Sequence, residues 1–238
     1  MRATAIIVAA GRGERLGGAL QKQFRPCAGR PLLAHALEQF CRARALVEEI
    51  ILVLPRAQDL EVHLGGSSAW PARVRAIGGG EDRQASVAAG LAAAPAADLV
   101  VVHDGVRPLV TARLIQDVCR EARRSGAAVA AGPCVDTVKE VRDGRVHATL
   151  ERDHLRLVQT PQAFQGDLLR RAHLQARRDG FRSTDDSALV ERLGVKVAVV
   201  ETAVPNLKVT GPDDWLVAEG LLAARRAVPL QGGTGQRE

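Results

Sequence analysis

The chain has 238 residues, of which 46% are hydrophobic, 25% charged and 3% aromatic, and its formal net charge is +6. This length supports one sizeable core, so we expect a single domain over residues 1–228 and a flexible tail over 229–238. Because the positive charge is spread along the chain and few aromatic side chains exist for base stacking, anionic small molecules are better candidate ligands than nucleic acid. No apolar run reaches the length of a membrane span.

The cysteines are widely separated, which disfavours a zinc site or a disulfide framework and is typical of a protein of the reducing cytosol. They are Cys27, Cys41, Cys119 and Cys134. The N-terminal apolar run enters a glycine-rich loop and does not have the pattern of a signal peptide. We therefore predict a cytoplasmic protein.

In chain order, the apolar patterns alternate between strands and helices. Strands are predicted at 5–9, 49–54, 72–77, 99–103, 127–132 and 195–200. Helices are predicted at 31–42, within 78–94 after a glycine-rich loop, and at 111–124, 167–178, 185–193 and 213–226, with a weak helix and a loop over 56–72. Residues 135–152 alternate around Asp143-Gly144, which predicts a projecting hairpin, whereas Thr160-Pro161-Gln162 is interpreted as a turn.

This alternation predicts an α/β fold with a Rossmann-like, doubly wound and mainly parallel sheet, from which the hairpin projects as an arm. Ligands of such sheets bind outside the carboxyl ends of the strands. The loops after the strands at 5–9, 72–77 and 99–103 are therefore expected to share one crevice.

The loop after the first strand combines Gly11, Gly13, Gly17 and Gly18 with Arg12, Arg15 and Lys22. Backbone N–H groups of such a loop converge on phosphate oxygens, and the cations add charge. Lys22 is followed by Gln23, which excludes a P-loop, and Leu16 occupies the third glycine position of a dinucleotide fingerprint. The alternative is a turn that binds nothing, but the cations favour phosphate.

Asp104 follows a buried strand, where one carboxylate is placed to hold Mg²⁺ beside phosphates, or else to cap a turn. Arg83, Arg107, Arg152 and Lys208 are candidate anion ligands or, alternatively, surface cations. Residues 183–186 are interpreted as a helix cap that also suits an anion. Because the sequence has no evident nucleophile triad or metal-ligand cluster, this inventory favours phosphoryl or nucleotidyl transfer.

Seven motifs in order resemble the 2-C-methyl-D-erythritol 4-phosphate cytidylyltransferase family of the non-mevalonate isoprenoid route. They are AAGRGERLGGALQKQF, GGGEDRQASV, VVHDGVRP, DTVKEV, QTPQAF, TDDSALVE and NLKVT. The resemblance implies a nucleotidyltransferase fold, CTP as a substrate with Mg²⁺ or another divalent cation, and a homodimer in which 135–152 is the dimerisation arm. It implies transfer of CMP from CTP to methylerythritol phosphate with release of pyrophosphate.

The resemblance also implies roles for individual residues. CTP lies on Ala9, Ala10 and Gly11, and its base is recognised by Gly80, Glu81 and Ser86. Asp104 helps to hold the metal ion, and the acceptor contacts Arg107, Thr137, Thr160 and Thr184. The catalytic cations are Arg15, Lys22, Lys208 and Arg152, and both Thr137 and Arg152 reach the site of the partner subunit.

Four positions depart from the family pattern, namely Gln21, Glu81, Gly105 and Val106. They leave open a shifted acceptor, and the alternative function is a cytidylyltransferase for another polyol phosphate such as ribitol 5-phosphate. A sugar 1-phosphate nucleotidyltransferase is disfavoured by the TPQAF and NLKVT motifs. A nucleotide-binding regulator or basic nucleic-acid binder without catalysis is disfavoured by Arg15, Lys22, Asp104 and Lys208 occurring together.

Overall fold

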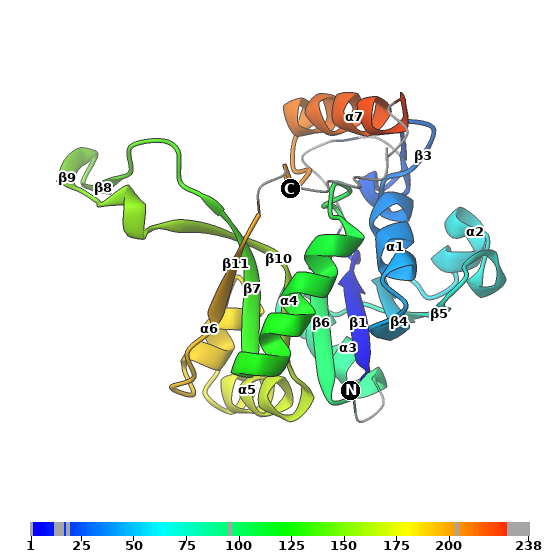
Figure 1. Ribbon diagram of the computed structural model, residues 1–238, viewed down its shortest axis with the longest axis horizontal. Coiled ribbons are helices and arrows are strands. Elements are labelled where there is room, and N and C mark those ends of the chain that lie inside the picture. Colours follow the sequence, from blue (N-terminus) through cyan, green and yellow to red (C-terminus); the bar gives the residue numbers. More distant parts are fainter. Residues whose placement is uncertain (1, 12–16, 18–19, 95–96, 203–204, 228–238) are drawn as a thin grey trace, which may run out of the picture.

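A seven-stranded sheet forms the centre of the molecule (Figure 1). The computed structural model describes residues 2–11, 17, 20–94, 97–202 and 205–227. The strand order is β11-β7-β10-β6-β1-β4-β5. In chain order the strands are β1 (Ala3–Val8), β4 (Val47–Leu54), β5 (Arg73–Gly78), β6 (Leu99–Asp104), β7 (Ala127–Pro133), β10 (Arg156–Gln165) and β11 (Ala198–Glu201).

The sheet is mainly parallel, as predicted. β1 runs parallel to both β4 and β6, β4 parallel to β5, and β7 parallel to β11. β10 is antiparallel to β6 and β7, between which it lies. The interpretation of Thr160-Pro161-Gln162 as a turn is therefore wrong, because these residues lie inside β10. The pairing of β10 with β7 is interrupted between Val158 and Gln162, and such an interruption is where a strand tolerates proline.

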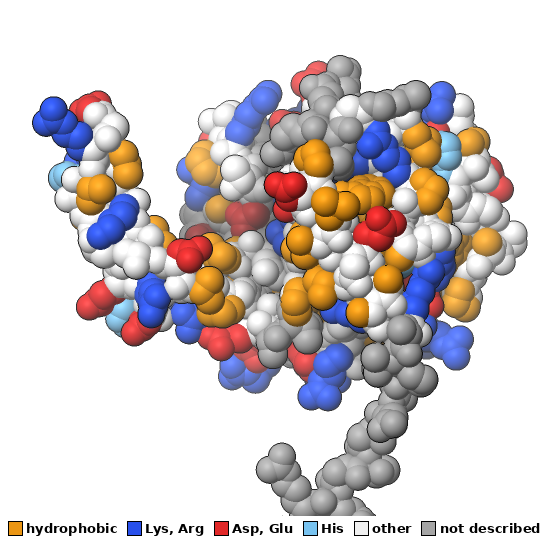
Figure 2. Space-filling model, turned by 90° about the horizontal axis from the view of Figure 1, so that it is seen from above, with side chains coloured by type: hydrophobic (Ala, Val, Ile, Leu, Met, Phe, Trp, Pro, Cys, Tyr) orange, Lys and Arg blue, Asp and Glu red, His pale blue; other side chains and the backbone are white. Residues whose placement is uncertain are grey.

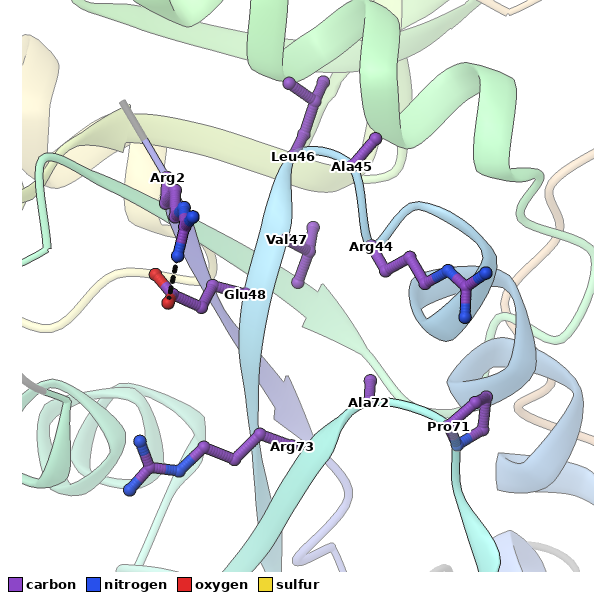
Figure 3. A pocket seen from close by; sticks show the side chains of 9 residues that line it. All are labelled: Arg2, Arg44, Ala45, Leu46, Val47, Glu48, Pro71, Ala72 and Arg73. Atoms are coloured by element: carbon purple, nitrogen blue, oxygen red, sulfur yellow. Dashed lines mark hydrogen bonds and ion pairs between the residues drawn. The ribbon is translucent and has the colours of Figure 1, made fainter.

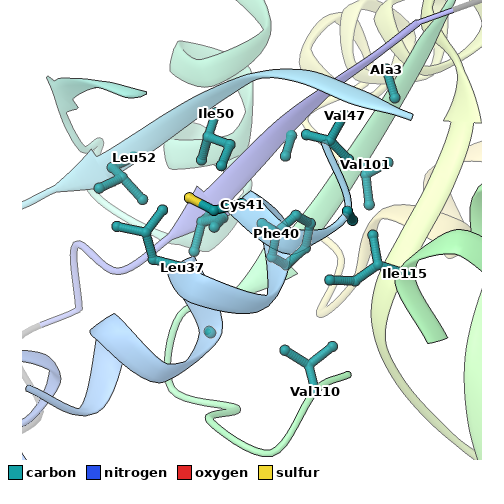
Figure 4. Close-up of a cluster of buried hydrophobic side chains, with 14 of the residues drawn as sticks. Ala3, Leu37, Phe40, Cys41, Val47, Ile50, Leu52, Val101, Val110 and Ile115 are labelled. Atoms are coloured by element: carbon teal, nitrogen blue, oxygen red, sulfur yellow. The ribbon is translucent and has the colours of Figure 1, made fainter. Parts of the chain in front are cut away.

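Helices cover both faces of the sheet. One face packs on α1 (Leu32–Arg42) and α4 (Ala112–Ser125). The other packs on α3 (Arg83–Ala93), α5 (Gly166–Arg178) and α6 (Asp186–Glu191). Figure 4 shows the first of these cores, where Leu37 and Phe40 of α1 approach Ile50, Leu52 and Val101 of the sheet. The doubly wound α/β fold predicted from the sequence is confirmed.

The strands show why the two cores separate. Along β1, Ala5 and Ile7 point into the α1–α4 core and Ile6 into the α3–α5 core. Successive strand side chains point to opposite faces, so a strand buried on both faces is apolar throughout. The helix starts are fixed by side-chain caps: Asp82 accepts from Ala85 N at 2.7 Å and Thr111 from Leu114 N at 3.2 Å.

A third, smaller apolar cluster lies beyond the carboxyl ends of the strands. α7 (Pro212–Ala227) packs there on β2 (Pro26–Cys27), which pairs with β3 (Arg30–Pro31). Cys27, Leu109, Val209 and Leu222 belong to this cluster. It places α7 at the same end of the molecule as the predicted crevice (Figure 1).

The predicted hairpin is present as β8 (Lys139–Arg142) and β9 (Arg145–Thr149), joined at Asp143 and Gly144, both of positive φ. It stands clear of the body in Figures 1 and 2. Val141 and Val146 are 57% and 63% exposed on this arm. Exposed apolar side chains on a projecting hairpin are a candidate contact surface.

The predicted weak helix at 56–72 is α2 (Asp59–Leu64) followed by the 3-10 turn η3 (Ser67–Ala69). Two further turns are η2 (Lys22–Phe24), before β2, and η4 (Arg152–His154), at the base of the arm. The strand predicted at 195–200 is the shorter β11. Among the described helices, none combines the length and apolar character that crossing a bilayer demands.

Candidate functional site

The loops after β1, β5 and β6 meet, as the sequence predicted. Gly105 N donates to Val8 O at 2.8 Å, which joins the ends of β6 and β1. A side chain on Gly79, after β5, would collide with the Cβ of Ala10. The chain leaves β1 toward β4 and β5 and returns to β6 on the other side of β1, so the crevice lies at the point where the winding of the sheet reverses.

Gln23 holds the first loop. Its Nε2 donates to the carbonyl oxygens of Ala9 at 2.8 Å and Gly11 at 3.2 Å, and the side chain is buried. Ala9 is also buried, whereas Gly11 is exposed. Residues 12–16 and 18–19, among them the predicted phosphate ligand Arg15, lie outside the described residues. The role of Gln23 in holding this loop was not predicted from the sequence. The only signal for it was a polar residue soon after a glycine-rich loop.

Asp104, at the end of β6, is surrounded by three cations. Its Oδ1 accepts from Arg83 Nε at 2.9 Å, and its Oδ2 lies 2.9 Å from Lys208 Nζ and 3.6 Å from Arg107 Nε. The carboxylate is only 8% exposed. Burial raises the pKa of Asp104, but Arg83 and Lys208 outweigh it and hold that pKa well below its ordinary value. Asp104 is therefore ionised.

Arg83 links Asp104 to a second buried carboxylate. Its Nη1 donates to Asp186 Oδ2 at 2.8 Å, and Asp186 Oδ1 lies 3.0 Å from His173 Nε2. Burial lowers the pKa of Arg83, but Asp186 and Asp104 together raise it above its ordinary value. Sequence reasoning treated Asp186 as part of a helix cap and did not single out His173. The cap is Asp185, whose Oδ1 accepts from Ala188 N at 3.2 Å.

His103 lies beneath the site and is fully buried. Asp104 N donates to Thr160 Oγ1 at 3.0 Å, which leaves the hydroxyl proton for His103 Nδ1 at 3.0 Å. His103 Nε2 then faces the carbonyl oxygen of Arg107 at 3.4 Å, so we assign the proton to Nε2. Burial is the main cause that lowers the pKa of His103 to about 3. A neutral, enclosed imidazole supports the site and is not placed to act as a general base.

Residues 205–211 form a crossing segment that passes over the site before α7. Asn206 Nδ2 donates to Thr160 O at 2.8 Å, and Val209 N donates to Val106 O at 2.9 Å. Lys22 Nζ donates to Val209 O at 2.9 Å, so the two predicted catalytic lysines, Lys22 and Lys208, meet at this segment. The end of the first glycine-rich loop and the crossing segment thus come together although they are far apart in sequence.

Arg107 is mostly enclosed, with 11% of its side chain exposed. Its Nη1 donates to the carbonyl oxygen of Asn206 at 2.8 Å. Arg107 therefore anchors the crossing segment and adds positive charge beside Asp104. Its predicted contact with the acceptor is not tested by these interactions.

The second glycine-rich loop begins after β5. Gly80 N donates to Ser86 Oγ at 3.1 Å, and Ser86 is buried in the first turn of α3. Glu81 is exposed at the surface of the loop. The predicted base-recognition residues are thus adjacent, with one backbone N–H already held by the serine hydroxyl.

Within one chain, the two predicted residues of the arm lie away from this cluster. Thr137 and Arg152 are exposed on the arm, where Arg152 Nη1 donates to Val135 O at 2.8 Å. The arm projects away from the body, so these residues are available to another molecule and not to their own crevice (Figure 2). Thr184 is exposed immediately before the cap of α6.

The described residues contain no group of three or more His, Cys, Asp or Glu side chains arranged to hold a metal ion. Asp104 offers one carboxylate, already balanced by cations. That donor set fits a Mg²⁺ ion whose other ligands are phosphate oxygens and waters, since this ion uses one or two carboxylates beside phosphates. Cys119 is buried, and burial is the main cause that raises its pKa to about 12, which excludes it as a thiolate nucleophile.

A separate hollow lies near the amino end of β4 (Figure 3). Arg2, Arg44 and Arg73 are among its lining residues, and Arg2 pairs with Glu48 at 2.6 Å. This end of the sheet is opposite to the carboxyl ends where Asp104 lies. It holds none of the residues predicted for the site.

A glycine-rich loop, a strand-end carboxylate and several lysines and arginines meet at the switch point of the sheet, an arrangement that suits an enzyme of the nucleotidyltransferase class. Residues 3–224 match the family model described as 2-C-methyl-D-erythritol 4-phosphate cytidylyltransferase. The chain belongs to this family.

Relatives and solved structures agree with this assignment. The chain is 42% identical to the enzyme of that description from Syntrophus aciditrophicus, with 93% of this chain and 96% of the relative covered. It is 46% identical to a bifunctional enzyme IspD/IspF from Desulforudis audaxviator, with 92% of this chain covered, and spans 56% of the length of that relative. The structure of 4-diphosphocytidyl-2C-methyl-D-erythritol synthase from Anaerococcus prevotii is similar with a TM-score of 0.81 and 32% identity, covering 93% and 98% of the two chains.

The family predicted from the seven motifs is confirmed. The predicted activity is confirmed as well, namely that of a nucleotidyltransferase of isoprenoid biosynthesis that acts on methylerythritol phosphate. The ribitol 5-phosphate alternative is not favoured by these comparisons. The roles of individual residues, the metal ion, the dimer and the cytoplasmic location stay predictions.

Proposed function

We propose that the crevice around Asp104 is where CMP passes from CTP to 2-C-methyl-D-erythritol 4-phosphate. The observation that supports this most directly is the enclosure of Asp104 by Arg83, Arg107 and Lys208 beside the first glycine-rich loop. Three cations against the carboxylates of Asp104 and Asp186 leave one net positive charge, which suits two anionic substrates.

The reaction exchanges one phosphoanhydride bond for another. An oxygen of the acceptor phosphate attacks the α-phosphorus of CTP, and the bond between that phosphorus and the bridging oxygen of the β-phosphate breaks. Pyrophosphate leaves with the bonding electrons, and the product is 4-diphosphocytidyl-2-C-methyl-D-erythritol. No protein nucleophile is needed, because positioning and charge stabilisation supply the catalysis.

Lys22 and Lys208 are the cations that we assign to the transition state. Lys208 is 40% exposed and pairs with Asp104 Oδ2, whereas Lys22 Nζ donates to Val209 O. Phosphate oxygens are stronger partners for the ammonium group of Lys22 than a backbone carbonyl, and the phosphates of CTP carry more negative charge than the one carboxylate that Lys208 contacts. We therefore expect both lysines to turn to the phosphates when CTP binds. Arg15 is assigned to the same phosphates from the sequence motif.

CTP is assigned to the two glycine-rich loops. Ala9, Ala10 and Gly11 lie beside the nucleotide, and Gly80, Glu81 and Ser86 recognise cytosine. The contact between Gly79 and Ala10 supports this assignment because it brings the two loops against each other. The acceptor is assigned to Arg107, Thr160 and Thr184, although the Thr160 hydroxyl is buried and already holds the backbone of Asp104.

Mg²⁺ would neutralise charge on the CTP phosphates, with Asp104 as the single protein carboxylate beside it. Asp104 itself is kept ionised by Arg83 and Lys208 and is therefore able to serve as a ligand. Release of Lys208 toward the phosphates would leave Asp104 Oδ2 accessible to the ion.

We further propose a cytoplasmic homodimer in which the arm carries Thr137 and Arg152 into the site of the partner subunit. The exposure of Val141 and Val146 on the arm supports burial against a second copy.

The experiment that tests this function is pyrophosphate release with CTP and Mg²⁺, comparing methylerythritol 4-phosphate with ribitol 5-phosphate. We expect release with the first acceptor alone. Release with ribitol 5-phosphate alone would retain the chemistry but reject the acceptor. Release with neither acceptor, from folded protein, would reject the proposal.

A further inference from the structure

Two buried side chains lie behind the site, Asp186 of α6 and His173 of α5, and they contact each other. Asp186 is the first residue of α6 and is 1% exposed, and His173 lies on α5 and is 7% exposed. Both oxygens of Asp186 are used, Oδ2 by Arg83 and Oδ1 by His173. The family assignment of the sequence gives neither residue a role.

The cost of this arrangement indicates that it does more than join helices. The carboxylate of Asp186 and the guanidinium of Arg83 lose hydration on burial, whereas apolar side chains of similar size join helices without that loss. Arg83 is held at both ends by carboxylates, yet its Nη2 is buried with no hydrogen-bond partner among the residues that the structure describes. The position of the guanidinium is therefore fixed by the two ion pairs and not by complete hydrogen bonding.

The two oxygens of Asp104 have different surroundings. Oδ1 faces Arg83, whose side chain is 22% exposed and anchored from behind by Asp186. Oδ2 lies 2.9 Å from Lys208 Nζ, whereas Arg107 Nε is 3.6 Å away and beyond hydrogen-bond distance. Lys208 is 40% exposed and has no second carboxylate among its ion pairs in the described part of the chain. One oxygen of Asp104 is thus held by an anchored arginine, whereas the cation at hydrogen-bond distance from the other is one that a substrate is able to draw away.

We propose that Asp186 and His173 are positioning residues for the cytidylyl transfer: they hold Arg83 on one oxygen of Asp104, so that the other oxygen keeps its orientation when Lys208 moves to the substrates. His173 orients Asp186, Asp186 orients Arg83, and Arg83 orients Asp104. This inference rests on the proposed function of the crevice. Small displacements of positioned groups reduce turnover strongly even when the displaced residue is far from the reacting atoms.

The central variant is Asp186→Asn, which keeps the shape of the side chain and removes its charge. We expect kcat for pyrophosphate release to fall about 10- to 100-fold at saturating substrates. His173→Gln retains an amide N–H to donate to Asp186 and is expected to stay within about threefold of wild type, whereas His173→Leu follows Asp186→Asn, as expected of a residue that acts by orientation.

The matched control is Asp179→Asn. Asp179 also joins α5 to α6 through an aspartate–arginine pair, with Arg192 at 2.9 Å, but this pair lies at the other ends of the two helices and has no contact with Arg83. Its removal is expected to lower the melting temperature slightly and leave kcat unchanged. A merely structural role for Asp186 predicts the same pattern for Asp186→Asn.

A crystal structure of Asp186→Asn supplies a readout that does not depend on activity. We expect Arg83 to leave Asp104 Oδ1 in that variant; Arg83 retained there, or a kcat equal to wild type in folded Asp186→Asn, overturns the inference. If wild-type protein releases no pyrophosphate, the proposed function fails by itself, and the crystal structure still decides whether Asp186 positions Arg83.

Discussion

Lys208 Nζ and Asp104 Oδ2 lie 2.9 Å apart, although Lys208 belongs to the crossing segment before α7 and Asp104 is the last residue of β6. Lys208 reaches this position because Asn206 and Val209, its neighbours in the segment, bond to Thr160 and Val106 respectively. The site is therefore assembled by the hydrogen bonds of residues adjacent to the lysine and not by the ion pair alone. Removing the lysine side chain is expected to leave the segment in place.

Lys208→Ala is accordingly expected to lower kcat by about 10²- to 10³-fold, the usual effect of removing one group that stabilises charge in a transition state. The melting temperature is expected to change little. Steady-state pyrophosphate release and thermal unfolding measure the two effects. Lys196→Ala removes an exposed lysine between α6 and β11 and serves as the matched control. Near-normal turnover of Lys208→Ala would remove this lysine from the mechanism.

Ser86→Ala tests the second glycine-rich loop. The change leaves Gly80 N without the acceptor that it has at 3.1 Å, and a hydrogen bond of this kind contributes about 0.5–1.5 kcal/mol. We expect KM for CTP to rise about two- to tenfold while kcat falls less. Titration of CTP binding by calorimetry gives the same comparison without turnover. An unchanged affinity for CTP would show that this hydrogen bond does not shape the nucleotide site.

Much of the fold was predictable because local patterns are strong where burial is complete. The run at 99–103 is apolar throughout, and β6 is buried on both faces. β10 was missed for a physical reason: Pro161 lacks a backbone donor and interrupts the pattern, and only its neighbours β6 and β7 hold the segment extended. The local sequence does not show which strands will pair with a segment and hold it extended.

The candidate site was likewise predictable only in part. Asp104 and the glycine-rich loops were predictable because the carboxyl ends of parallel strands converge. The link from Arg83 to Asp186 was not, since it joins residues far apart in the sequence and depends on how α3 and α6 pack on the same face of the sheet. Arg83 alone was a candidate anion ligand, and its ion pairs with two carboxylates are the basis on which we propose it as a fixed support.

Gly105 is one of the departures from the family pattern, and packing accounts for it. A Cβ at this position would lie 2.7 Å from Leu33 Cδ1 and 2.9 Å from Ala9 Cβ. We expect Gly105→Ala to destabilise the fold by about 1–3 kcal/mol, as overpacking does. Urea unfolding measures this change in the free energy of unfolding.

The control for Gly105→Ala is Gly220→Ala. Gly220 lies on an exposed face of α7, and a Cβ there would meet nothing within 4 Å. This substitution is expected to stabilise the protein by up to about 1 kcal/mol, because alanine favours a helix. Equal stability of Gly105→Ala and wild type would show that Leu33 and the first loop adjust freely, and the packing account would then fail.

The arm gives a prediction about shared sites. Arg152→Ala and Asp104→Asn are each expected to be nearly inactive, because one removes a cation and the other the strand-end carboxylate. If Arg152 serves the partner subunit, mixing the two inactive proteins restores one intact site in each heterodimer, or about a quarter of all sites in a random mixture. Pyrophosphate release after confirmed subunit exchange measures the recovery. Absence of recovery would indicate that each site is built from one chain.

His103 predicts how stability depends on pH. Its pKa is lowered from an ordinary value of 6.5 to about 3, mainly by burial, so between these values the unfolded chain binds a proton that the folded protein does not. Stability therefore falls as the pH drops through this window, by at most about 1.4 kcal/mol for each pH unit from this residue. His35 adds a change of the same sign, because burial also lowers its pKa.

Urea unfolding at pH 6.5 and pH 5.0 tests this assignment in a range above the ordinary pKa of the carboxylates. Wild type is expected to lose about 2 kcal/mol from His103 between the two conditions. His103→Asn keeps an acceptor for the Thr160 hydroxyl but does not titrate, so its loss is expected to be smaller, with only His35 and other groups remaining. Equal losses in wild type and His103→Asn would mean that His103 takes up a proton in the folded state, and the assignment of a neutral imidazole beneath Asp104 would be wrong.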